Sequence, residues 1–123
     1  MAHVSHVQVV SIPVSNQDRA KAWYRDILGF QELADEPMGP ESRWVQLGLA
    51  GGNTSITLVT WFDSMPAGSL KGVVLATDDV DAAAAELARK GVAVTPIDSQ
   101  PWGRFTTFSD PDGNGFVLQS APA

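Results

Sequence analysis

Cysteine is absent from the 123 residues of the chain, and positive charge is scarce. Without a thiol the chain has no disulfide scaffold, no thiolate metal ligand and no cysteine nucleophile. Lysine and arginine together number 8 against 14 acidic residues, which gives a formal net charge of −6. Because phosphate contacts dominate the affinity of proteins for nucleic acids, we expect no DNA or RNA partner.

Long apolar runs are absent as well. No apolar stretch approaches the roughly 20 residues that a membrane-spanning helix needs, so we expect no membrane partner. Residues 1–8 lack the basic segment and the apolar core of a signal peptide. We therefore expect a cytoplasmic protein. The length and the 44% hydrophobic fraction suit a single domain, residues 1–123, that buries its own core.

The first half of the chain contains a strand–helix unit followed by more strands. Residues 7–14 are rich in β-branched side chains and predict a buried strand. Asn16 is a candidate N-cap, and apolar residues at three- and four-residue steps predict a helix over Gln17–Leu28 that ends at Gly29. Apolar character resumes at Phe30, and two further strands are predicted over residues 43–49 and 55–62.

The second half repeats this pattern after a linker predicted at residues 65–69. Residues 70–77 predict a strand, and Asp79 is the candidate cap of a helix over residues 80–90 that Gly91 ends. Three more strands are predicted over residues 93–97, 104–108 and 116–120.

The two halves correspond position by position. Thr77 follows Val14 by 63 residues (77 − 14), and Gly91 follows Gly29 by 62 (91 − 29). A period close to half the chain length indicates a duplication. We therefore predict an α+β fold of two tandem βαβββ modules, at about residues 5–63 and 70–121. One helix can cover only one face of each sheet, which leaves the other face for a cavity or a partner.

Several segments carry a resemblance to a known family. Residues 13–16 are PVSN and lead to AWYRDILGF at residues 22–30, while residues 75–82 are LATDDVDA and residues 108–114 are FSDPDGN. In order and spacing these segments resemble the glyoxalase, bleomycin-resistance and extradiol-dioxygenase superfamily, also called the vicinal oxygen chelate family. The resemblance covers nearly the whole chain. It implies a pseudo-twofold between the modules, strands that curl around a cavity and, in chains of this length, a homodimer.

The same segments also have structural interpretations. Asp110-Pro111-Asp112-Gly113 has the residue types of a type I turn. Asp78 and Asp79 suit a helix N-terminus through capping and the helix dipole. We favour these structural roles over metal binding by the carboxylates.

Enzymes of this family hold a divalent metal with one His, Glu or Gln from each of four strands. Counted from the motifs, the resemblance places these four positions on Val9, Thr57, Gly72 and Val117, with Ile56 as the alternative to Thr57. Metals with open substrate positions favour imidazole or carboxylate ligands, which none of these residues supplies. His3 and His6 both precede the first strand. We therefore expect no metal site and no cofactor.

Strand alternation predicts which side chains line the cavity. In the first module it selects Val9, Ser11, Thr57, Val59 and Trp61; in the second it selects Gly72, Val74, Ala76, Val117 and Gln119. The lining would be apolar with a few polar groups, as ligand sites commonly are. The predicted ligand-binding residues are Ser11, Thr57, Val59, Trp61, Trp102, Arg104 and Gln119.

The tryptophans near the strands and Arg104 each have an alternative role. Trp44, Trp61 and Trp102 lie at or beside strands and could stack on an aromatic or cationic ligand, or could serve as core or dimer contacts. Arg104 could hold an anion or pair with one of the many surface acids.

Three functional hypotheses follow. The first is a metal-free protein that binds a small aromatic or cationic molecule in an apolar cavity. The second is a glyoxalase-like lyase or dioxygenase-type enzyme, metal-free or with an atypical metal site, although no catalytic residue can be identified. The third is a subunit whose cavity is vestigial and whose role is association.

Overall fold

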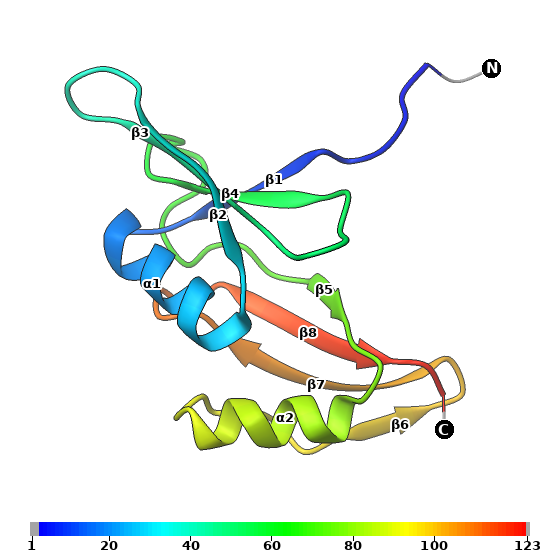
Figure 1. The fold of residues 1–123 in the computed structure, drawn as a ribbon. Helices are drawn as coiled ribbons and strands as arrows, with labels where there is room; N and C mark the ends of the chain where they lie inside the picture. Colours follow the sequence, from blue (N-terminus) through cyan, green and yellow to red (C-terminus); the bar gives the residue numbers. More distant parts are fainter. Residues whose placement is uncertain (1–2, 123) are drawn as a thin grey trace. The chain divides into compact units, whose positions relative to one another are not determined.

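The computed structural model describes residues 3–122 and shows two compact units that divide between Ala67 and Gly68 (Figure 1). The division falls inside the segment predicted as a linker. Each unit contains one helix and one four-stranded sheet, so that the predicted α+β fold of two βαβββ modules is confirmed.

The first unit contains one parallel and two antiparallel strand pairs. Its elements are β1 (Val9–Pro13), α1 (Gln17–Leu28), β2 (Gln31–Pro37), β3 (Arg43–Gly48) and β4 (Ser55–Val59). The strand order is β1-β4-β3-β2, in which β1 is parallel to β4 and the other pairs are antiparallel. We call this sheet A; α1 packs against β3 and β4.

The second unit repeats the topology of the first. Its elements are β5 (Val73–Ala76), α2 (Val80–Arg89), β6 (Asp98–Gln100), β7 (Gly103–Ser109) and β8 (Gly115–Ser120). The strand order β5-β8-β7-β6 again places the first strand parallel to the fourth. We call this sheet B; α2 contacts β7 and β8 (Figure 1). The equivalent orders support the duplication inferred from the sequence.

Both helices begin at the predicted caps. The Asn16 side chain accepts a hydrogen bond from the Arg19 amide at 3.0 Å, and the Asp79 side chain accepts one from the Ala82 amide at 3.0 Å. These side chains satisfy amides that have no partner within the first helical turn. Gly29 ends α1 with φ at 79°, a left-handed conformation that favours glycine.

The core of the first unit lies between α1 and sheet A. Ile12, Val45, Leu47 and Leu58 are fully buried, and so is Tyr24 from α1. The Tyr24 ring meets Phe30 edge to face, with 5.7 Å between the ring centroids. Tyr24 therefore serves the core, as its position on the helix suggests. In the second unit the stacked rings of Phe108 and Phe116 have the same role.

The strand predicted at residues 93–97 is wrong in position, because the regular strand β6 comes later, at Asp98–Gln100. Thr95 instead joins its segment to β7 through irregular hydrogen bonds. Its amide donates to the Thr107 carbonyl at 3.1 Å, and its carbonyl accepts from the Thr106 hydroxyl at 2.6 Å. The next residue, Pro96, has no N–H to donate to a regular ladder.

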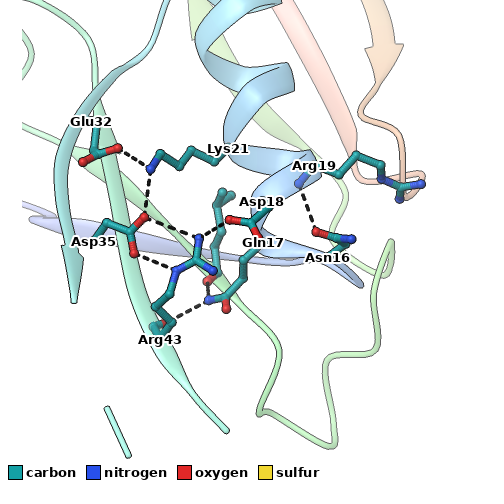
Figure 2. Close-up of polar contacts among 9 residues, drawn as sticks. Asn16, Gln17, Asp18, Arg19, Lys21, Glu32, Asp35 and Arg43 are labelled. Carbon is teal, nitrogen blue, oxygen red and sulfur yellow. Dashed lines mark hydrogen bonds and ion pairs between the residues drawn. The ribbon is translucent and has the colours of Figure 1, made fainter. Parts of the chain in front are cut away.

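A network of charged side chains joins α1 to β2 and β3 (Figure 2). The Arg43 guanidinium donates to Asp35 through Nε at 2.6 Å and to Asp18 through Nη2 at 2.7 Å. Lys21 donates to Asp35 at 2.8 Å and forms an ion pair with Glu32. The hydrogen bond from Lys21, with a further one from Arg43, holds the pKa of Asp35 below its usual value. Asp35 is thus the shared acceptor of the network.

Replacing Asp35 by asparagine is expected to lower the free energy of unfolding by about 1 kcal/mol at pH 7, since one charge-assisted hydrogen bond is lost and others are weakened. Because folding lowers the pKa of this carboxyl, its contribution is complete above the unfolded pKa of about 3.9 and is lost as the pH falls through the folded value. Urea unfolding at pH 7 and pH 3 measures this. A stability difference that persists unchanged at pH 3 would contradict it.

Candidate functional site

Within the second unit, α2 covers one face of sheet B and leaves the other face uncovered. The register aligns Ala76 with Gln119 and Gln119 with Phe105, and it aligns Val74 with Val117. Because side chains alternate along a strand, these residues share one face, which we call the helix-free face. Val74 is 56% exposed there, whereas Phe116 and Leu118, which follow the opposite parity, are buried.

A hollow of about 280 Å³ lies at the end of this face where β5 and β8 finish. It is lined by Val74, Ala76, Thr77, Trp102, Gln119, Ser120 and Ala121. Four of these residues, Val74, Ala76, Trp102 and Gln119, were predicted from the sequence as cavity or ligand-binding residues. The volume is just below the range of about 300–1,000 Å³ that is usual for ligand pockets, so the hollow suits a small ligand or part of a larger one.

Trp102 has the largest side chain of the residues that line the hollow. Its indole stacks on the Phe105 ring with 5.3 Å between centroids and 13° between planes, yet the residue remains 58% exposed. Stacking on Phe105 orients the indole, while its exposed surface is available to another ring. Phe105 was not among the predicted site residues, because its place on this face follows from the register of β7 against Gln119.

Arg104 takes the second of its two proposed roles. Its guanidinium donates to both carboxylate oxygens of Asp81, at 2.5 and 3.1 Å, and its Nε donates to Ser99 at 3.1 Å. The hydrogen bonds from Arg104 lower the pKa of the Asp81 carboxyl, and the same pair raises the pKa of Arg104. Arg104 is not among the residues that line the hollow.

The corresponding face of sheet A carries the other predicted residues. The register aligns Ser11 with Thr57 and Thr57 with Gln46. Thr57 and Val59 are buried, and the Thr57 hydroxyl donates to the Val45 carbonyl at 3.0 Å. Trp61 lies just beyond β4, with its ring 6.0 Å from that of Phe62.

Polar side chains on sheet A are linked in a chain of hydrogen bonds. Trp44 Nε1 donates to Gln46 Oε1 at 3.1 Å, Gln46 Nε2 donates to Ser55 Oγ at 2.7 Å, and Ser55 Oγ donates to the Gln8 carbonyl at 3.2 Å. Gln46 and Ser55 also line a separate hollow, and His6 is another of its lining residues. The Trp44 N–H is therefore engaged in the sheet rather than free to bind a ligand.

The residues that the family resemblance assigns to the four metal positions do not fit a divalent ion. Val9 and Val117 have no donor atom, Gly72 has no side chain, and the Thr57 hydroxyl already donates to a carbonyl. Within residues 3–122, no group of three or more His, Cys, Asp or Glu side chains is arranged to hold a metal.

Two tandem βαβββ modules, each with one sheet face covered by a single helix, define a protein of the vicinal oxygen chelate class. The family model of the Glyoxalase/Bleomycin resistance protein/Dioxygenase superfamily matches residues 3–118. The chain belongs to this superfamily, as the sequence motifs indicated. In the described part of the chain, no helix is long and apolar enough to cross a membrane.

Solved structures and curated relatives agree with this assignment. TnmS3, an antibiotic binding protein from Streptomyces sp. CB03234, is 50% identical, with a TM-score of 0.93 over 98% of this chain and 99% of that one. A superfamily member from Sphaerobacter thermophilus is 34% identical, with a TM-score of 0.89 over 97% and 99%. Protein YetH of Bacillus subtilis is 31% identical over 120 residues, which are 94% of this chain and 98% of that protein.

Proposed function

We propose that the chain binds a small aromatic molecule on the helix-free face of sheet B, without a metal. The observation that carries the proposal is the indole of Trp102, which is stacked on Phe105 and largely exposed above an uncharged hollow. The sequence identity of 50% with TnmS3, an antibiotic binding protein, supports a binding role over a catalytic one.

The energetics favour a flat ligand. An aromatic ring that covers the exposed indole removes apolar surface of both partners from water, at roughly 25 cal/mol per Å². Offset stacking adds about 0.5–1.5 kcal/mol beyond this burial. Val74 and Ala76 extend the apolar surface beside the indole, while Gln119, Thr77 and Ser120 place polar groups at its margin. This combination is typical of ligand sites.

A glyoxalase-like lyase or dioxygenase-type enzyme finds no support in the hollow. Its polar lining residues, Thr77, Gln119 and Ser120, include no histidine, carboxylate or lysine that could act as a general base. A hydroxyl without such a base is a weak nucleophile at neutral pH. Binding is therefore the function that the geometry supports best.

Titration calorimetry with naphthalene-2-carboxamide tests the proposal. We expect binding with the same Kd in buffer containing EDTA and in buffer containing zinc or manganese, because the hollow acts through burial and stacking. Binding that requires the metal would contradict the metal-free site. The absence of heat and of any thermal shift across a panel of two-ring aromatic compounds would contradict the binding function itself.

We also propose that the chain forms a homodimer, as the family resemblance implies. Several large apolar side chains outside the hollow are exposed and would leave water on association, among them Val7, Leu33, Leu49 and Phe62. Light scattering at micromolar concentration is expected to give twice the chain mass of 13.1 kDa. A mass of one chain under these conditions would contradict the proposal.

We propose the cytoplasm as the compartment of the protein. A chain without cysteine gains nothing from an oxidising compartment, where disulfides form. Fractionation of cells that express the tagged chain tests this, and recovery in a secreted fraction would contradict it.

A further inference from the structure

Gly103 lies in contact with the carboxamide of Gln119. A Cβ atom at position 103 would lie 3.0 Å from Gln119 Nε2, 3.4 Å from Gln119 Cδ and 2.9 Å from the Ser120 carbonyl oxygen. These separations are shorter than ordinary contacts between carbon and other heavy atoms. Because Gly103 has no side chain, the Gln119 carboxamide can rest on its backbone, one residue from Trp102.

The Gln119 carboxamide is not engaged in the fold. Among the described residues, no hydrogen bond involves Gln119 Oε1 or Nε2. The residue is nevertheless half-buried and lines the hollow. A carboxamide offers two donors and an acceptor. In the register, Gln119 lies between Ala76 and Phe105, so these polar groups adjoin the aromatic stack.

The hollow contains no charge that would match a charged ligand. None of its seven lining side chains is ionisable. The nearest cationic neighbour in sequence to Trp102, Arg104, is paired with Asp81 on the other face. A charged ligand would lose hydration on entering and would gain no ion pair in return.

We infer that Gly103 is a positioning residue that keeps room for the Gln119 carboxamide beside Trp102. The pair selects uncharged aromatic ligands that carry a hydrogen-bonding group at the edge of the ring. This inference rests on the proposed function, and it narrows the ligand class from small aromatic molecules to neutral aromatic molecules with a polar edge.

Three naphthalene probes of similar size test the selection: naphthalene-2-carboxamide, 2-methylnaphthalene and naphthalen-2-ylmethylammonium. We expect the wild-type protein to bind the carboxamide about 5- to 10-fold more tightly than either of the others, since one hydrogen bond is worth about fivefold. Equal affinity for the carboxamide and the methyl compound, or tighter binding of the ammonium compound, would overturn the inference.

Two variants test whether Gln119 and Gly103 cause the preference for the carboxamide probe. Gln119→Leu keeps an apolar side chain of similar size and is expected to bring the ratio of carboxamide to methyl affinity close to one. Gly103→Ala is expected to lower the same ratio by displacing the carboxamide, a readout that a merely destabilised protein would not change. Gln100→Leu is the matched control in the same unit, because the Gln100 side chain bonds to Asp98 instead, and it should keep the wild-type ratio.

The outcomes separate this inference from the proposed function. If Trp102→Ala weakens the binding of the carboxamide and of the methyl compound while Gln119→Leu leaves their affinity ratio unchanged, the inference fails and the aromatic site stands. If Trp102→Ala changes neither affinity, the proposed function fails with it. Should Gly103→Ala not fold, because of its contact with the Ser120 carbonyl, the Gln119→Leu ratio alone decides.

Discussion

Trp102→Ala is expected to weaken the binding of naphthalene-2-carboxamide by about 1–3 kcal/mol, or about 5- to 150-fold in Kd, the usual scale for the loss of an aromatic contact of this size. The exposed indole is the largest side chain in the lining of the hollow, and it stacks on the Phe105 ring. Alanine at position 102 would leave the ligand against Val74 and Ala76 alone. Because Trp102 is exposed, the folded state should lose little stability.

Calorimetric titration of both proteins measures this effect, and Trp61→Ala is the informative companion. Strand parity in the sequence placed Trp61 in the cavity, whereas the structure brings Trp102 into the lining of the hollow. We expect the Trp61 variant to retain an affinity within about twofold of wild type, since Trp61 is not one of the residues that line the hollow. The reverse ranking of the two variants would contradict the site on sheet B.

Asn114→Ala is expected to lower the free energy of unfolding of the second unit by about 2–4 kcal/mol. Asn114 is fully buried, and its Nδ2 donates to the Asp110 carboxylate at 2.7 Å. Its Oδ1 accepts from the Leu70 amide at 3.1 Å. Alanine removes both hydrogen bonds, so the Leu70 N–H loses this acceptor and the Asp110 carboxylate loses this donor. Losing a partner at a buried group costs more free energy than losing an exposed hydrogen bond.

Urea unfolding of the second unit, followed by amide hydrogen exchange in β7 and β8, measures the loss. The matched control is Asn53→Ala, because Asn53 lies exposed in the turn before β4 and its replacement should cost less than about 0.5 kcal/mol. Equal and small effects for the two variants would show that the buried carboxamide does not hold the hairpin between β7 and β8 together.

Features set by local chemistry could be predicted from the sequence. Asn16 and Asp79 cap their helices as expected, because a cap depends on the side chain and the amides that follow it. The turn at Asp110 also forms as predicted, with the Gly113 amide donating to the Asp110 carbonyl at 3.0 Å. The duplication could be found for the same reason, since it repeats these local signals at one spacing.

Features that depend on pairing between distant residues could not be predicted. The pairing of Arg104 with Asp81 joins β7 to α2, and nothing near Arg104 in the sequence indicates it. The segment around Thr95 has the apolar pattern of a strand. Its hydrogen bonds with Thr106 and Thr107, several of them through side-chain hydroxyls, replace the regular ladder, and Pro96 has no N–H to donate. The stack of Trp102 on Phe105 likewise required the register of the folded sheet.

Anomalous diffraction from crystals soaked with naphthalene-2-carboxamide together with zinc and manganese tests the central claim most directly. We expect density for the naphthalene ring within about 4 Å of the Trp102 indole, with the amide of the probe against Gln119. We expect no anomalous peak within bonding distance of Val9, Thr57, Gly72 or Val117, because their side chains do not supply the ligands that such ions prefer. A metal peak bonded to any two cavity-facing side chains, with the probe ligated to that metal and away from Trp102, would contradict it.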